Sequence, residues 1–520
     1  MNRGSSALVA LIVLLSSGCA TVVAGSPTAV GKGGGGEGGQ QQPTVPEGPP
    51  DRDLRAVTAA LRELDACKLF DKSRSEGVKV TAVPTGPHSC LLYPGDDHIL
   101  NDGMRLEVGA DSDQLARFSA RPVTIGGFKG YWTHDGDGGE SCRVTLPVSH
   151  TRAIEMTYRL DGEEDVCDIV LDYAEGTVAL LQKPDALKVD PKKRTLASWD
   201  GCFLLATVLG DDKLRYEPEG TYDPLSGCYA ASVDGSSQDT FKLEVQYDKW
   251  DPLGEEKTTV AGKDAAFMDY DTSCAVEWNH GPSGVGDEWF VATAMKLDAP
   301  TCEKAKELAE AAEKLIADGA FDKGAKPQRP LLYKPDESDT GTLGACANFA
   351  QGADGDCEPF RPDTQLPTGT DALLAAGSSN RHTQCAVFKD AVAEVYGTEF
   401  EPITWGAHCL FVEPTGALMI TVNVDAENAP APYGSDPNLY SDRKTTEVEG
   451  KAAVTFYNSG KTSYDVYVSP YNDISRAGNV HIGVEAWPAR GVGGGTPEVD
   501  PAKLTAADEV IAKVVKQYFT

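Results

Sequence analysis

The sequence predicts an α+β fold of three tandem, disulfide-stapled modules, and three repeated observations lead to this prediction. A cysteine recurs before a short apolar run, a second cysteine follows at a similar interval, and alternating apolar and polar residues come next. Alternation of period two is typical of strands with one buried face. We therefore expect each repeat to form an antiparallel β-sheet packed with N- and C-terminal helices.

The first pair of cysteines defines the repeat. The stretches ELDACKLF, SWDGCFLL and NRHTQCAVF each carry the first cysteine, and the second follows 23, 26 and 24 residues later. This recurrence predicts one disulfide at the same place in each copy. The predicted pairs are Cys67 with Cys90, Cys202 with Cys228, and Cys385 with Cys409.

Strands and a tight turn are expected after the second cysteine. RLEVGA, KLEVQY and MITVNV alternate with period two, and a glycine follows a β-branched residue further along each copy, at Gly127, Gly262 and Gly450. Glycine at this place suits a turn that needs positive φ.

The next cysteines distinguish the third copy from the other two. SCRVTL and SCAVEW carry Cys142 and Cys274, whereas SYDVYV carries Tyr464 instead. The third copy also lacks the partner that the others have in Cys167 and Cys302, and a joint loss is what a bonded pair predicts. The remaining pair, Cys346 and Cys357, is expected to form a local loop disulfide.

Helices are expected at the ends of the copies. Residues 299–319 are rich in Ala, Glu and Lys, with apolar residues at helical spacing, and residues 500–519 show a similar pattern. Both segments should pack one apolar face against a sheet.

The N-terminal region resembles an export signal with a lipid anchor. Nine apolar residues, Ala7–Leu15, are too few to span a bilayer, and Leu15–Cys19 resembles a bacterial lipobox, with Leu15 one residue further out than usual. Cys19 is thus the candidate lipidation site. Ordinary cleavage nearby, which would leave Cys19 a free thiol, is the alternative. A segment rich in Gly, Gln and Pro follows and should be a flexible tether.

The expected organisation divides the chain into six segments. They are a signal peptide (1–18), a tether (19–52), module 1 (53–188), module 2 (189–322), a linker with a local disulfide (323–375) and module 3 (376–520).

Charge and cysteine usage limit the class of partner. The formal net charge of −32 disfavours nucleic acid as a partner. Twelve cysteines beside Cys19 favour an oxidising compartment, in which they form disulfides. The expected location is the extracytoplasmic face of the cell membrane.

The chain resembles a known family of actinobacterial lipoproteins, those with the domain of unknown function 3558. The resemblance rests on the lipobox, the tether, an Asp-x-Cys-x-Leu-Leu opening at Asp200–Leu205, and Cys302–Ala309 in the second copy. The third copy departs from this opening. The resemblance implies a cell-envelope lipoprotein, and the family brings no activity with it.

No motif in the sequence predicts catalysis, a cofactor or a metal site. The eight histidines form no metal-ligand spacing, and there is no nucleophile elbow, phosphate loop or dinucleotide fingerprint. A triad assembled from scattered residues remains an open alternative. Aromatic residues after the shared glycine are a candidate ligand groove between sheet and helix, with core packing as the alternative. They are Tyr131, Trp132, Phe267, Tyr270, Phe456 and Tyr457.

These observations favour a non-enzymatic binding or scaffold protein of the cell envelope. Serial modules on a tether suit contact with an envelope protein, glycan or lipid. A lipid or small-molecule carrier with a pocket in one or more modules is the alternative, and an envelope hydrolase ranks below both.

Overall fold

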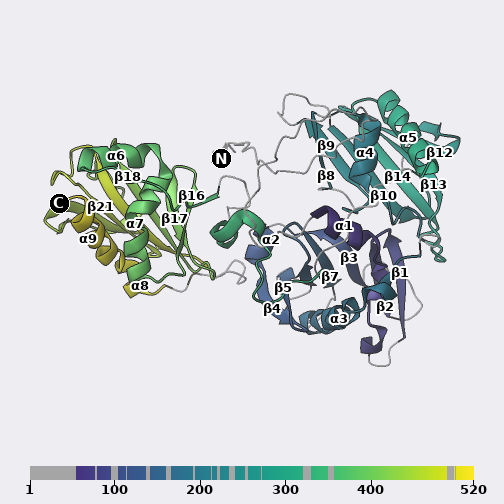
Figure 1. The fold of residues 1–520 in the computed structure, drawn as a ribbon, viewed down its shortest axis with the longest axis horizontal. Helices are drawn as coiled ribbons and strands as arrows, with labels where there is room; N and C mark the ends of the chain where they lie inside the picture. The colour runs from purple at the N-terminus through teal and green to yellow at the C-terminus, as the bar shows by residue number, and fades with distance from the viewer. Residues whose placement is uncertain are drawn as a thin grey trace, which may run out of the picture. The chain divides into compact units, whose positions relative to one another are not determined.

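The structure is a computed structural model that falls into two compact units. One unit extends to Thr342 and the other begins at Leu343, and each is described by itself. Figure 1 labels their helices and strands. The described residues are 54–75, 79–94, 103–112, 114–135, 141–159, 166–190, 194–211, 213–218, 223–232, 240–251, 256–270, 272–319, 330–349, 357–488, 497 and 499–520.

The first unit contains modules 1 and 2, each with a seven-stranded antiparallel sheet. Module 1 comprises α1 (Leu54–Arg62), the 3-10 helices η1 (Ala66–Leu69) and η2 (Lys72–Ser75), β1 (Val80–Gly86), β2 (Ser89–Pro94), β3 (Met104–Asp111), α2 (Gln114–Ser119), β4 (Arg121–Ile125), β5 (Phe128–Asp135), β6 (Ser141–Pro147), β7 (Arg152–Arg159), α3 (Val166–Leu181) and η3 (Pro184–Leu187). Module 2 comprises α4 (Gly201–Leu209), β8 (Leu214–Glu217), β9 (Cys228–Ser232), β10 (Thr240–Asp248), β11 (Glu256–Val260), β12 (Lys263–Tyr270), β13 (Ser273–Pro282), β14 (Ala292–Ala299) and α5 (Cys302–Ala317).

The second unit contains module 3, whose sheet has eight strands. It comprises η4 (Gly341–Asn348), β15 (Glu358–Pro359), α6 (Thr370–Ser379), α7 (Arg381–Val395), β16 (Glu401–Trp405), β17 (His408–Val412), β18 (Leu418–Asp425), β19 (Tyr440–Val448), β20 (Lys451–Asn458), β21 (Ser463–Val468), β22 (Asn479–Ala486), α8 (Pro501–Thr505) and α9 (Ala507–Tyr518).

All three sheets have the same strand order. In module 1 the order is β1-β2-β3-β7-β6-β5-β4, and the other two repeat it, module 3 adding β15 at one edge. A three-stranded meander and a four-stranded meander are thus joined where the last strand pairs with the third. Leu106 lies opposite Met156, Val245 opposite Met295 and Val422 opposite Ile482 in these joining pairs. The three modules that the sequence predicts therefore share one sheet topology.

The shared glycine closes the same hairpin in each module. Two consecutive turn residues have positive φ: Gly126 and Gly127 (55° and 85°), Ala261 and Gly262 (51° and 81°), Glu449 and Gly450 (48° and 73°). Two-residue hairpin turns with positive φ at both positions match the right-handed twist of the flanking strands. This conformation explains why glycine occupies the second position in all three.

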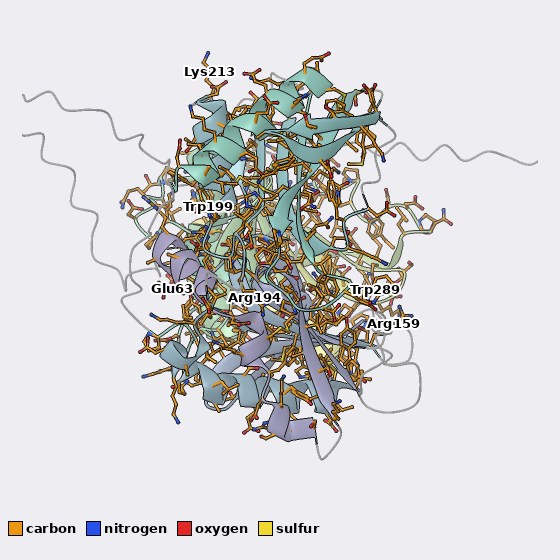
Figure 2. All side chains as sticks on the ribbon, turned by 90° about the vertical axis from the view of Figure 1, so that its right-hand side faces the viewer. Glu63, Arg159, Arg194, Trp199, Lys213 and Trp289 are labelled. Carbon is orange, nitrogen blue, oxygen red and sulfur yellow. A yellow bond between two sulfur atoms is a disulfide. The ribbon has the colours of Figure 1, made fainter. Side chains whose placement is uncertain are left out.

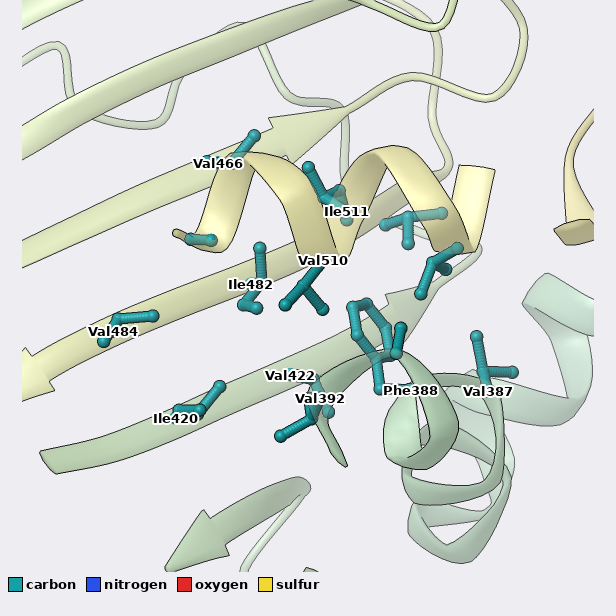
Figure 3. Close-up of a cluster of buried hydrophobic side chains, with 14 of the residues drawn as sticks. Val387, Phe388, Val392, Ile420, Val422, Val466, Ile482, Val484, Val510 and Ile511 are labelled. Atoms are coloured by element: carbon teal, nitrogen blue, oxygen red, sulfur yellow. The ribbon is translucent and has the colours of Figure 1, made fainter. Parts of the chain in front are cut away.

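Helices pack on one face of each sheet and enclose the main core. In module 3, Phe388 of α7 and Val510 of α9 meet Ile482 of β22 in a cluster of buried side chains, as Figure 3 shows. In module 2, the Thr301 side chain caps α5 by accepting a hydrogen bond from the Lys304 amide, so the helix begins at Cys302 beside the sheet.

The connector between modules 2 and 3 does not behave as a simple linker. The carboxylate of Asp339, in the first unit, is buried on module 1, where it accepts hydrogen bonds from Tyr131 (2.8 Å) and Lys129 (3.0 Å). In the second unit, Cys346 and Phe349 pack with Leu410 on the sheet face opposite the helices. The connector thus contributes to the cores on both sides of Thr342.

No helix among the described residues is both long and apolar enough to cross a membrane.

Candidate functional site

Six disulfides join the twelve cysteines of the described residues. In each module one bond joins an N-terminal helical segment (η1, α4 or α7) to a strand of the sheet (β2, β9 or β17), and modules 1 and 2 also have a bond from the sheet to the C-terminal helix. The bonded pairs are Cys67–Cys90, Cys142–Cys167, Cys202–Cys228, Cys274–Cys302, Cys346–Cys357 and Cys385–Cys409, the same as the predicted pairs. Cys19 lies outside the described residues.

A hydrogen bond takes the place of the disulfide that module 3 lacks. Tyr464 is the second residue of β21, as Cys142 is of β6, and Asp508 is the second residue of α9, as Cys167 is of α3. The Tyr464 hydroxyl donates to Asp508 Oδ1 at 3.0 Å. Burial raises the pKa of both groups, which keeps the tyrosine a donor.

The aromatic residues of the expected groove do not share one face. Tyr131 is buried against Asp339, whereas its neighbour Trp132 packs on the helix-side core. Phe456 likewise packs against Tyr440, with 4.8 Å between ring centroids, whereas Tyr457 packs on the helix-side core. Neighbouring residues of a strand point to opposite faces, so such pairs cannot line one groove.

The corresponding residues of module 2 are also separated. Phe267 packs against the core, and Tyr270 is 48% exposed. The groove hypothesis thus gives way to core packing for most of these residues.

Modules 1 and 2 are joined by a buried polar cluster around His88. Its Nδ1 lies 3.0 Å from both carboxylate oxygens of Asp223 and 3.2 Å from Ser226 Oγ, and its Nε2 lies 2.7 Å from the Ala197 carbonyl oxygen. All of these partners belong to module 2, and His88 is 1% exposed. Buried polar groups that satisfy one another across an interface fix its geometry.

This cluster contains serine, histidine and aspartate, yet its geometry is not that of a catalytic triad. A triad places serine at one imidazole nitrogen and aspartate at the other. Here Ser226 and Asp223 both face Nδ1 of His88, and the Ala197 carbonyl occupies Nε2. The cluster is therefore described better as an interface contact than as a nucleophile with its base.

Further contacts surround the cluster. Arg62 of α1 pairs with Asp200 at 2.6 Å and donates to the Leu225 carbonyl at 3.2 Å. Leu225 belongs to the module 1 core, and a side chain at Gly109 would collide with it, because an added Cβ would lie 2.5 Å away. Polar and apolar contacts together make modules 1 and 2 one body.

A cleft of about 560 Å³ lies between the two modules. One wall is Thr81–Pro84 of β1, and the other is Gly284–Asp287, in the loop between β13 and β14. The polar side chains Asp65, Lys68, Asp190 and Arg194 complete the lining. Figure 2 labels Arg194, which belongs to module 2.

Apolar contacts hold the second wall in place. Val285 and Phe290 of the loop pack against Val83, Leu91 and Tyr93 of module 1. Burial and the nearby Asp287 carboxylate raise the pKa of the Tyr93 hydroxyl. Sequence reasoning missed this cleft because, although Asp65 and Lys68 lie in the first repeat stretch, both walls and Arg194 lie outside the repeated cysteine stretches.

The described residues offer one cluster of metal-ligand type, and it does not fit a metal. Asp269 lies near Cys274 and Cys302, but these cysteines are bonded to each other and are not free as thiolate ligands.

Comparison with known proteins identifies no relative. No family model, no curated protein and no solved structure matches the chain. The structure shows three tandem cysteine-stapled modules, and their many disulfides indicate an extracytoplasmic location.

Proposed function

We propose that this chain is a non-enzymatic binding protein of the cell envelope, whose modules 1 and 2 form one receptor for a small ligand. The observation that carries the proposal is the 560 Å³ cleft between two modules that are fixed to each other. Ligand sites are usually clefts of about 300–1,000 Å³ at domain interfaces, with a few polar groups among apolar ones. Val83, Pro84 and Val285 provide the apolar part of such a lining, and five charged side chains of the described lining, Arg194 among them, make this cleft more polar than the usual site.

The proposal includes a lipid anchor at Cys19. The lipobox-like Leu15–Cys19 and the likeness to actinobacterial lipoproteins support it. A cysteine that carries several acyl chains would attach the protein stably to the membrane. Labelling cells with a palmitate analogue should mark the wild-type protein and not the Cys19→Ala variant; label on both would contradict the anchor.

The ligand site is tested by filling the cleft. Gly286 lines the cleft, and a Cβ added there meets no atom within 4 Å, so the side chain of Gly286→Trp begins in open space. We expect organic extracts of the natively purified wild type to contain a stoichiometric small molecule that is absent from the Gly286→Trp extract.

A matched control keeps this test specific. Gly460 of module 3 is also exposed, and a Cβ there meets only Thr462 atoms at 3.9 Å, so Gly460→Trp should retain the ligand. Equal ligand in all three proteins would overturn the cleft as the binding site. Empty extracts throughout would favour the second candidate, a scaffold that contacts envelope proteins or the wall through several modules.

A further inference from the structure

Arg194 is a partly buried cation in the lining of the cleft. Its side chain is 13% exposed, and its Nη2 lies 3.3 Å from Asp65 Oδ1. Among the described residues, Asp65 is the only acceptor for this guanidinium. A guanidinium has five N–H donors in a planar fork, and among the described residues Asp65 accepts from one of them.

The backbone beside Arg194 is held in place. The Thr195 amide donates to the Ser283 carbonyl at 3.2 Å, and the Thr195 hydroxyl donates to the Pro282 carbonyl at 2.7 Å. Tyr247 of β10 donates to the Thr195 carbonyl at 2.7 Å. The linker segment that carries the guanidinium is thus fixed to module 2, which makes the fork a preorganised donor.

The charges around Arg194 limit the kind of anion. Among the described residues that line the cleft, Asp65, Asp190 and Asp287 are acidic and Lys68 and Arg194 are basic. Like charges repel in a partly desolvated site, so these acidic groups disfavour a dianion such as phosphate more than a monoanion. A single carboxylate satisfies the planar fork with two parallel hydrogen bonds.

The wall beside this group is apolar. Ala82, Val83 and Pro84 of β1 line the cleft with Val285, and Val285 packs directly against Val83. Apolar surface removed from water here would stabilise the complex. A ligand with an apolar body and one charged end therefore fits both parts of the lining.

We propose that the ligand of the cleft is an amphiphilic monocarboxylate. Its carboxylate accepts hydrogen bonds from Arg194, and its apolar body lies along Val83, Pro84 and Val285. This proposal rests on the cleft being the binding site.

The direct test is calorimetric titration of the full chain with octanoate, with the neutral octanamide as the matched ligand. We expect octanoate to bind the wild type with at least tenfold higher affinity than octanamide. Arg194→Gln should remove that preference, because the amide lacks both the charge and the fork. Arg361→Gln, at a side chain that is 66% exposed in module 3, is the control and should leave it unchanged.

A second variant separates recognition from folding. Arg194→Lys keeps the charge beside Asp65 but loses the planar fork, so it should fold as the wild type does and bind octanoate with intermediate affinity. Unfolding curves of both variants show whether the first unit is intact.

The outcomes distinguish this inference from the proposed function. If Gly286→Trp abolishes the natural ligand while octanoate fails to bind, or binds Arg194→Gln as well as the wild type, the cleft stands and the carboxylate is overturned. If Gly286→Trp changes neither the natural ligand nor octanoate binding, both proposals fall.

Discussion

Glu107 is a partly buried carboxylic acid, 20% exposed, at the face of module 1 that meets module 2. Burial raises the pKa of Glu107 to about 7, the nearby Arg105 guanidinium opposes this shift, and the Asp223 and Glu155 carboxylates add to it. Glu155 lies directly opposite Glu107 on β7, so the two would repel each other if both were charged. The fold therefore favours the protonated form of Glu107.

A pH dependence of stability follows from this residue. The carboxyl has a higher pKa in the folded chain than in the unfolded chain, so the first unit loses stability as the pH rises from about 4.5 through about 7. Glu107→Gln removes this loss. The unfolding free energy of Glu107→Gln minus that of the wild type should increase by up to about 3 kcal/mol over this pH range. Chemical denaturation across this pH range measures it, and a difference that does not vary with pH would contradict the account.

Asp339 provides a second prediction at the scale of one residue. Its carboxylate lies 3.6 Å from Arg117 Nε and 3.0 Å from Lys129 Nζ, and both Asp339 and Arg117 are 2% exposed. Asp339→Ala leaves these cations without their carboxylate and should lower the unfolding free energy of the first unit by about 3 kcal/mol. Hydrogen exchange should quicken across residues 331–339.

The exposed Asp336, on the same segment, is the control for this change. Asp336→Ala should leave both stability and exchange as in the wild type. If Asp339→Ala also left stability and hydrogen exchange unchanged, the ion pairs would not be what holds the connector on module 1.

The link between the sheet and the C-terminal helix is a disulfide in modules 1 and 2 and a hydrogen bond in module 3. Substitution can convert the hydrogen bond of module 3 into a disulfide. Tyr464 and Asp508 occupy the strand and helix positions that hold a disulfide in modules 1 and 2. The double variant Tyr464→Cys with Asp508→Cys should therefore form a seventh disulfide. Such a bond should raise the stability of module 3 by about 2–4 kcal/mol.

Mass spectrometry after alkylation under non-reducing conditions counts the free thiols of this variant. The expected protein has no new free thiol and a higher unfolding temperature than wild type. Two free thiols after oxidative refolding would mean that β21 and α9 do not meet as the repeat implies. Tyr464→Phe, which removes only the hydrogen bond, should cost about 1 kcal/mol.

The elements that recur along the chain are those that the sequence could predict. Cysteine spacing led to the bonded pairs, and the glycine after the β-branched residue marked the hairpin turns with positive φ. The aromatic groove could not be judged in the same way. Tyr131 and Trp132 are both apolar enough for the core, and only the strand's register decides which face each one occupies.

At the scale of the whole molecule, what the sequence could not reveal is how modules combine. His88, Asp223 and Arg194 lie in turns and linkers outside the repeat, and each differs from its counterparts in the other copies. Their contacts depend on two separate folds meeting at one angle, which no local pattern encodes. The cleft is a product of this docking, so it belongs to the pair of modules and to neither alone.

The central claim is that the cleft between modules 1 and 2 holds a ligand. Hydrogen exchange of the natively purified protein, before and after small molecules are stripped on a hydrophobic resin, tests it most directly. With ligand present, we predict slower exchange at the two walls, Thr81–Pro84 and Gly284–Asp287, and no change in module 3. Walls that exchange equally in both samples, or protection confined to module 3, would contradict the claim.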